Sequence, residues 1–227
     1  MESLREIPLF NSLTDEEGVR YGKSCIWKSY DEHELVIDID EETTDVRFVV
    51  SGRVRVINRI AVGKEVILGE IEPGQFFGEL AALDNESRSA NITALYKSRI
   101  CIVTQQIFLE ILERKPDIAL KVMRVLSNRI RTVNMRLAEQ SFLQTKHRLY
   151  AELIRLSKPR LGHEGQRSIS PPPTQKELSE RIGTRREVVS REINQLTKEG
   201  LFEKTRGALV LTDVATLQRR ISDAWNE

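Results

Sequence analysis

Residues 174–196 read TQKELSERIGTRREVVSREINQL and contain two helix starts separated by a turn. Thr174 and Thr184 are each followed three residues later by a glutamate, which is the Thr-x-x-Glu form of a helix capping box. Gly183 lies between the two starts and favours a tight turn. Four apolar residues of the second helix fall on one face, namely Val188, Val189, Ile193 and Leu196. Two helices joined by a short glycine-containing turn predict a helix-turn-helix whose second helix presents a charged outer face.

Residues 182–191, Ile-Gly-Thr-Arg-Arg-Glu-Val-Val-Ser-Arg, closely resemble the recognition motif of the Crp–Fnr family of bacterial transcription regulators. In that family an Arg-Glu-x-x-x-Arg pattern reads the DNA major groove, and here it falls on Arg186, Glu187 and Arg191. The chemistry agrees, because an arginine can bind guanine O6 and N7 together and a glutamate can accept from cytosine N4. Glu187 also has a structural interpretation, as the acid of the second capping box.

Residues 200–211, GLFEKTRGALVL, predict two short strands on either side of Arg206-Gly207. This hairpin would form a wing whose Lys204 and Arg206 contact DNA phosphates. With the family resemblance, the residues expected to bind DNA are Thr174, Thr184, Arg185, Arg186, Glu187, Ser190, Arg191, Lys204 and Arg206. Residues 144–227 carry 16 Lys and Arg against 11 Asp and Glu, whereas residues 1–143 carry 19 against 23. The positive charge therefore lies in the part predicted to bind a polyanion.

Upstream of this region the sequence predicts a helix that ends near Leu156 and then a loop over residues 157–173, rich in Gly, Pro and Ser. A longer helix is predicted after Pro116. Its apolar residues recur at spacings of 4, 3, 4, 3 and 4, at Ala119, Met123, Leu126, Ile130, Val133 and Leu137. A repeat of this period is typical of a helix packed along a partner helix, and it favours a homodimer. The alternative is a helix that lies on its own β-sheet.

From Cys25 to Val103 the chain consists of short segments rich in β-branched residues, separated by turn signals at Ser51-Gly52, Gly63-Lys64 and Pro73-Gly74. The expected strands cover residues 35–39, 46–50, 54–57, 66–68, 92–95 and 100–103. Many short strands at nearly regular spacing predict an all-β sandwich or jelly roll.

The predicted β region contains PGQFFGELAAL at residues 73–83 and RSANI at residues 88–92. Gly78 permits a tight turn, and a short helix starting at Glu79 would direct backbone N–H groups at an anion. Arg88 and Ser89 supply a guanidinium and a hydroxyl for a phosphate, and Glu79 can accept from a ribose hydroxyl. The set predicts a nucleotide with one phosphate and a free 2′-hydroxyl. The structural alternative is an Arg88–Glu79 ion pair that only tightens the sandwich.

This segment resembles the phosphate-binding cassette of cyclic-nucleotide-binding domains, in which Phe-Gly-Glu-Leu-Ala is followed about nine residues later by Arg-Ser/Ala-Ala. The match spans roughly residues 20–115 and includes Gly52 and Gly63-Lys-Glu65, whereas Asp40 replaces a frequent glycine. The resemblance implies cyclic AMP, cyclic GMP or both as the allosteric ligand. It implies a ligand-binding set of Leu68, Gly78, Glu79, Leu80, Ala81, Arg88, Ser89, Val133 and Asn134.

Val133 and Asn134 depart from the Thr-Ser pair with which the family reaches the adenine. Valine cannot form a hydrogen bond to an exocyclic group, and an asparagine amide has both a donor and an acceptor. Neither purine would therefore leave Asn134 without a hydrogen-bond partner. We expect weak discrimination between cyclic AMP and cyclic GMP.

These features predict an α+β fold with three parts: an N-terminal β jelly-roll cyclic-nucleotide-binding domain over residues 1–116, a long dimerisation helix over 117–143, and a C-terminal winged helix-turn-helix over 144–227. We expect a homodimeric, cyclic-nucleotide-responsive activator that binds a palindromic site on double-stranded DNA and contacts RNA polymerase. One alternative is a regulator of the same family that is ligand-independent or responds to a cyclic dinucleotide. Another is a nucleotide-regulated subunit of an enzyme or channel, which the helix-turn-helix and the absence of a catalytic motif argue against.

Composition argues against several other classes. The 2 cysteines and 3 scattered histidines form no ligand cluster in the sequence, so neither a metal site nor a tightly bound cofactor is expected. No pattern of nucleophile and base indicates catalytic residues. No apolar run approaches the roughly 20 residues of a membrane helix, and no hydrophobic signal core follows the N-terminus. We expect a cytoplasmic protein in which Cys25 and Cys101 are buried free thiols.

Overall fold

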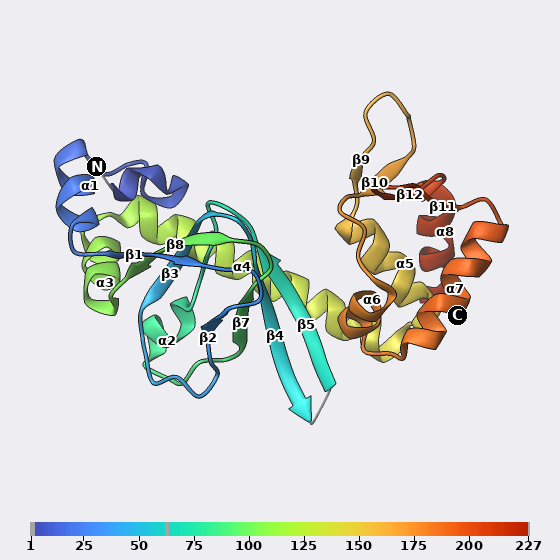
Figure 1. Ribbon diagram of the computed structural model, residues 1–227, viewed down its shortest axis with the longest axis horizontal. Helices are drawn as coiled ribbons and strands as arrows, with labels where there is room; N and C mark the ends of the chain where they lie inside the picture. Colours follow the sequence, from blue (N-terminus) through green and yellow to red (C-terminus); the bar gives the residue numbers. More distant parts are fainter. Residues whose placement is uncertain (1–2, 62–63, 227) are drawn as a thin grey trace. The chain divides into compact units, whose positions relative to one another are not determined.

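The computed structural model describes residues 3–61 and 64–226 (Figure 1). The chain divides into two compact units, Met1–Ile130 and Arg131–Glu227, and the division falls inside one long helix, α4, Pro116–Phe142. Gly63, expected in the turn Gly63-Lys64, lies outside the described residues.

The first unit is built on two four-stranded antiparallel sheets. One has the order β1-β8-β3-β6 and consists of Ile26–Tyr30, Ser98–Val103, Val46–Ser51 and Phe76–Phe77. The other has the order β2-β7-β4-β5 and consists of Leu35–Ile37, Asn91–Ala94, Val54–Ala61 and Lys64–Ile71. Strands far apart in sequence, such as β1 and β8, pair with each other, which is the arrangement of a jelly roll. All six predicted strands are confirmed, and β1 and β6 add to them.

Strand β3 shows why these residues form a sandwich. Phe48 and Val49 are fully buried but point to opposite faces of the sheet, because side chains alternate along a strand. Val49 packs with residues of the second sheet, such as Val54 and Ile92, in the core between the sheets. Phe48 packs on the other side, where its ring centroid lies 4.9 Å from that of Phe10. The central strand is therefore buried on both faces and reads as a continuous apolar run.

Helical elements that were not predicted from the sequence cover the outer side of the sheet that contains β3. They are η1 (Leu4–Glu6), η2 (Pro8–Phe10), α1 (Asp15–Gly22) and α3 (Gln105–Arg114). Helix α1 begins with a capping box, in which Thr14 Oγ1 accepts from Glu17 N at 3.2 Å and the Glu17 carboxylate accepts from Thr14 N at 2.8 Å. The same Thr-x-x-Glu signal that marks residues 174–177 is thus present at residues 14–17.

Helix α4 is the predicted long helix, and its faces have different environments. Ile118 and Val122 are buried in the core of the first unit. The predicted apolar stripe lies largely on another face, where Met123, Ile130, Val133 and Leu137 are each more than half exposed. The alternative of a helix lying on its own sheet accounts for Ile118 and Val122 but leaves these four residues uncovered.

The second unit packs helices against a small sheet. The helices are α5 (Thr145–Leu156), α6 (Gln175–Ile182), α7 (Arg186–Lys198) and α8 (Val214–Trp225). The sheet has the order β11-β12-β10-β9, formed by Phe202–Lys204, Leu209–Leu211, Arg167–Ile169 and Lys158–Pro159. The expectation of a continuous loop over residues 157–173 is wrong, because β9 and β10 lie within it. The three-residue segment β10 is a strand because it pairs with β12, remote in sequence, on one side and with β9 on the other.

Candidate nucleotide-binding site and nucleic-acid interface

The predicted phosphate cassette (residues 73–92) turns at Gly78, between β6 and helix α2, Glu79–Asp84. Gly78 has φ of 81°, in the left-handed region that favours glycine. A Cβ atom at this position would lie 2.6 Å from Nη1 of Arg88 and 3.0 Å from the backbone oxygen of Asp45. Both the backbone angle and the lack of space require glycine, and the close approach places Arg88 against the start of α2.

The guanidinium of Arg88 joins three segments of the first unit, and only 4 % of the residue is exposed. Nη1 donates to the backbone oxygens of Asp45 and Gly78, each at 3.0 Å, and Nη2 donates to Thr43 Oγ1 at 2.7 Å. Burial lowers the pKa of Arg88, and the Asp45 carboxylate, 3.3 Å from Nη2, opposes this shift. In the described part of the chain, Nε of Arg88 is buried without a hydrogen-bond partner. The arginine thus retains one buried donor beyond those that hold its own loop.

The carboxylate of Glu79 is buried beside the same turn. Its Oε1 accepts from Arg129 Nη1 at 2.6 Å, and Arg129 Nη2 donates to the backbone oxygen of Phe76 at 2.6 Å. Arg129 belongs to α4 and lies over the ring of Phe76, 5.2 Å from its centroid. Glu79 therefore bonds α4, whereas Arg88 bonds the segment around Asp45, an arrangement that differs from the Arg88–Glu79 pair considered as the structural alternative.

The remaining expected ligand residues differ in environment. Ala81 is buried under α2. The exposed members are Leu68, Leu80, Ser89, Val133 and Asn134. Leu68, Leu80 and Ser89 belong to the first unit, whereas Val133 and Asn134 lie on the part of α4 that belongs to the second. Gly78, Glu79 and Arg88 are the three expected residues that the structure brings together at the start of α2.

In the second unit, α6 and α7 form a helix-turn-helix. Thr174 Oγ1 accepts from Glu177 N at 3.1 Å, and the Glu177 carboxylate accepts from Thr174 N at 2.6 Å, so the first predicted capping box is confirmed. The helix ends at Gly183, whose φ of 65° is in the left-handed region. Leu178 and Val189 are fully buried where the two helices pack together with α5.

The second predicted capping box is wrong. Helix α7 begins at Arg186, and its N-cap is Arg185, which makes no side-chain capping bond. Thr184 precedes this start because its backbone N still donates to Ser179 O, at 3.0 Å, in the turn that closes α6. Glu187 has no capping role in this geometry, and its exposed side chain lies on the outer surface of α7.

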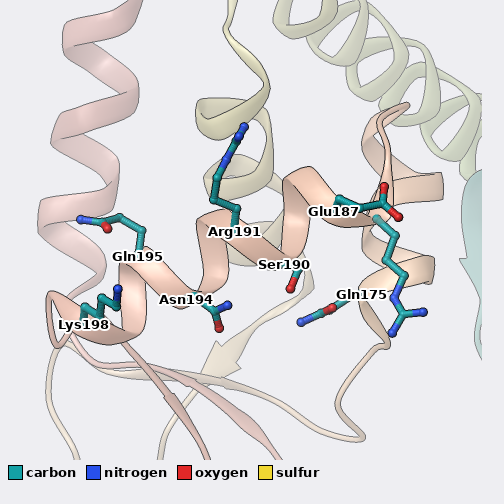
Figure 2. A pocket seen from close by; sticks show the side chains of 8 residues that line it. Gln175, Glu187, Ser190, Arg191, Asn194, Gln195 and Lys198 are labelled. Atoms are coloured by element: carbon teal, nitrogen blue, oxygen red, sulfur yellow. The ribbon is translucent and has the colours of Figure 1, made fainter.

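A polar pocket lies on the outer side of α7 and is shown in Figure 2. We call its lining residues the reading face; they are Gln175, Arg186, Glu187, Ser190, Arg191, Asn194, Gln195 and Lys198. All but Gln175 come from α7, and Gln175 comes from the first turn of α6. Opposed to this face, Val189 and Leu196 hold α7 against the core. Packing on one side therefore leaves the polar side of the helix accessible.

The predicted wing is present as the hairpin of β11 and β12. Its turn is closed by Thr205, whose N donates to Ala208 O at 3.0 Å and whose Oγ1 accepts from Ala208 N at 3.2 Å. Lys204 and Arg206, the two cations expected to contact phosphates, are exposed.

Other classes of site are not indicated in the described residues. Over residues 3–61 and 64–226, no group of three or more His, Cys, Asp or Glu side chains could hold a metal ion. Among the helices of those same residues, none combines the length and apolarity that would allow it to cross a membrane. Cys101 is buried and Cys25 is partly buried, and neither forms a disulfide.

Two family models match this chain, one to each half of the architecture. The model described as the cyclic nucleotide-binding domain matches residues 27–115, and the model described as the Crp-like helix-turn-helix domain matches residues 147–220. The chain belongs to the Crp–Fnr family. Both matches agree with the order of the β sandwich, the long helix and the winged helix-turn-helix found in the structure.

The relatives of this Crp–Fnr chain are transcription regulators and not enzymes. The cyclic AMP receptor protein of Thermus thermophilus is 29 % identical over 170 residues, which cover 75 % of this chain and 76 % of that protein. A CRP-like cAMP-activated global transcriptional regulator of Mycobacterium tuberculosis is 26 % identical over 174 residues, covering 76 % and 77 %. A CooA variant from Carboxydothermus hydrogenoformans has the same fold, with a TM-score of 0.80, 22 % identity and coverage of 97 % and 96 %.

The Crp–Fnr motif accounts for only part of the reading face. Arg186, Glu187, Ser190 and Arg191 are common to the expected DNA-binding set and the pocket lining. The residues that sequence reasoning missed are Gln175, Asn194, Gln195 and Lys198. For Asn194, Gln195 and Lys198 helical spacing was the available signal, because residues at intervals of three and four from Glu187 share its face. Gln175 belongs to α6, and only tertiary packing brings it to this pocket.

Proposed function

We propose that this Crp–Fnr regulator is a homodimeric transcription activator of the cytoplasm that binds cyclic AMP, cyclic GMP or both. Its DNA target would be a palindromic double-stranded site, and RNA polymerase would be a further partner. The observation that carries the ligand assignment is Arg88, which is buried at the glycine turn that starts α2 and whose Nε has no hydrogen-bond partner among the residues that the structure describes. The names of the two relatives, a cyclic AMP receptor protein and a cAMP-activated regulator, favour the same ligand class.

In this proposal the cassette binds the cyclic phosphate with groups that are already in place. Arg88 supplies charge and the Nε donor, Ser89 supplies a hydroxyl, and the first N–H groups of α2 point toward the same anion. Glu79 would accept from the ribose 2′-hydroxyl through Oε2, and this bond would draw charge from the carboxylate whose Oε1 accepts from Arg129. In this proposal the turn at Gly78 would bring these groups within reach of one small ligand.

Arg129 offers a route from the ligand to α4. Because its guanidinium bonds both Glu79 and the backbone of Phe76, a ligand that draws on Glu79 changes the anchoring of α4. A ligand shifts a conformational equilibrium only by making different contacts in the two states. We propose that the Glu79–Arg129 bond is where this difference arises.

The dimer and its DNA site follow from two exposed surfaces. The apolar stripe of α4, exposed in one chain, would be covered by the same stripe of a second copy. Two reading faces in one dimer would enter successive major grooves, with half-sites about 34 Å apart. We retain the division into residues 1–116, 117–143 and 144–227 as part of this proposal.

Calorimetric titration of the purified protein with cyclic AMP, cyclic GMP and linear 5′-AMP tests the ligand assignment. We expect saturable heats for the cyclic nucleotides and a weaker response to 5′-AMP, together with tighter DNA binding when a cyclic nucleotide is present. Absence of binding by either cyclic nucleotide would reject the assignment. A parallel titration with a cyclic dinucleotide identifies the alternative ligand class.

A further inference from the structure

A buried ionic cluster lies in the second unit where α4, α5 and α6 meet. Its centre is Glu152 of α5, of which 2 % is exposed. The Glu152 carboxylate accepts from Nη2 of Arg136, on α4, at 3.3 and 3.4 Å, and from Arg155, one turn along α5. It also lies 3.6 Å from Nη1 of Arg181, on α6. Arg155 in turn donates to Glu139 of α4 at 2.6 Å.

The cluster spans the point where the chain changes direction. Helix α4 ends at Phe142 and α5 begins at Thr145, so two residues connect them. One carboxylate, that of Glu152, reaches from α5 to α4 on one side and to α6 on the other.

The ionic cluster restricts the relative orientation of the helices more than apolar packing would. Paired guanidinium and carboxylate groups have preferred geometries, whereas apolar side chains can slide over one another. A buried ion pair is often replaceable by apolar residues without loss of stability, so its value can lie in the arrangement it specifies. Here the arrangement specified is that of the first helix of the helix-turn-helix relative to the end of α4.

We propose that Arg136 and Glu152 are positioning residues for DNA recognition, which hold the helix-turn-helix at one orientation on the C-terminal end of α4. This inference rests on the proposed homodimer. In that dimer the orientation of each helix-turn-helix on α4 sets the separation of the two reading faces. The cluster therefore determines which spacing of DNA half-sites the protein accepts.

Arg136 is the member whose removal weakens the cluster with least damage. Burial opposes the charge of Arg155, but Glu152 and Glu139 together raise its pKa, whereas in Arg136 burial outweighs Glu152 and the pKa is lowered. Arg136→Met keeps the apolar stem of the side chain and leaves Glu152 with Arg155 and Arg181. Removing Glu152 would instead leave three buried or half-buried guanidinium groups facing one another, and such a variant would misfold.

The matched control is Arg131→Met. Arg131 lies on the same helix, is exposed, and like Arg136 flanks the apolar stripe. Any effect of charge on dimerisation would therefore be common to both variants. Arg136→Lys retains the charge but not the planar fork, and tests whether directional bonding is needed.

The experiment measures affinity for DNA duplexes that carry two copies of the half-site that the wild-type protein selects from a random pool. Their spacing is the selected one, or is changed by two base pairs in either direction, at saturating cyclic AMP. We expect wild type and Arg131→Met to lose about tenfold or more on the altered spacings, and Arg136→Met to lose less than about threefold. Arg136→Lys should lie between them, and binding to a single half-site should be equal in all four proteins.

The outcomes separate this inference from the function on which it rests. If Arg136→Met loses as much affinity on the altered spacings as wild type does, the positioning role is overturned. It is also overturned if wild type binds two half-sites better than one but binds every spacing equally well, and in that case the proposed dimer stands. Wild type that binds two half-sites no better than one overturns both. A uniform loss of affinity by Arg136→Met on all duplexes, including the single half-site, shows a structural role only and rejects the proposal.

Discussion

The two arginine-containing sites of this protein are built in opposite ways. Arg88 is buried, bonds to two backbone oxygens and a threonine, and sits where only glycine fits beside it. Arg186 and Arg191 are exposed on α7, on the side of the helix away from the core. The first site holds its cation in place through contacts within the protein, whereas in the proposed function the long exposed side chains of the second would become ordered on binding DNA.

The difference follows from the size of the partner. A small anion has few groups to contribute, so the protein must supply a positioned charge and exclude water from it. A DNA groove contributes phosphates and base edges over a large area, and it can order flexible side chains itself. Changes at the buried site should therefore affect stability and function together, whereas changes on the reading face should affect DNA binding alone.

The largest effect is expected for Arg88→Ala. Loss of a charge-assisted partner should weaken cyclic-nucleotide binding by about 2–4 kcal/mol, or roughly 30- to 1,000-fold. The melting temperature should also fall, because Asp45, Thr43 and Gly78 lose the donor that joins them. Calorimetry and thermal unfolding measure the two effects, with the exposed Arg59→Ala on β4 as the control. Unchanged nucleotide affinity in the folded variant would remove Arg88 from the ligand site.

Arg186→Ala should reduce affinity for the cognate site by about 1–3 kcal/mol and relax specificity at one guanine position. Its melting temperature should equal that of wild type, because the side chain is exposed. Lys204→Ala on the wing is the matched comparison, since a phosphate contact should weaken all sequences alike and reduce the salt slope by about one unit. Fluorescence anisotropy over a series of mutated half-sites measures both variants. Equal losses of Arg186→Ala on specific and random DNA would contradict base reading by this residue.

A smaller effect is expected for the discrimination between cyclic AMP and cyclic GMP. Their two dissociation constants should lie within about tenfold of each other, or 1.4 kcal/mol. The reason is that Asn134 can accept from an amino group or donate to a carbonyl, so neither purine leaves it without a partner. Titration of both nucleotides into wild type and Asn134→Ala tests this prediction, with Thr132→Ala as the neighbouring control. A preference greater than about a hundredfold that persists in Asn134→Ala would place base recognition elsewhere.

The smallest effects concern stability within the helix-turn-helix. Thr174→Ala removes a capping hydroxyl and should lower the unfolding free energy by about 1 kcal/mol. Thr184→Ala should cost clearly less, because α7 starts without a side-chain cap. Chemical denaturation of the two variants compares them directly. A loss for Thr184→Ala as large as that for Thr174→Ala would restore the second capping box.

Local sequence patterns predicted those helices, turns and strands that depend on interactions between residues close together in the sequence. The box at Thr174 and Glu177, the glycine turn at Gly183 and the β-branched runs all describe interactions between near neighbours in sequence. The strands of the sandwich, α4 and the helix-turn-helix were therefore predictable. Strand β10 was not, because its three residues form a strand through pairing with β9 and with β12, which is remote in sequence.

The sequence by itself determined the class of this protein, since the glycine turn with Arg88 and the Arg-Glu-x-x-x-Arg motif are local arrangements of chemically specific residues. The tertiary structure decided how those residues are held. It assigned Asp45 and Thr43 to Arg88 and Arg129 to Glu79, pairs separated by up to 50 positions in the chain. It also placed Glu187 outside a capping role and gathered Arg136, Arg155 and Arg181 around the buried carboxylate of Glu152. Partners of charged groups depend on which segments pack together, and that is a property of the whole fold rather than of any short pattern.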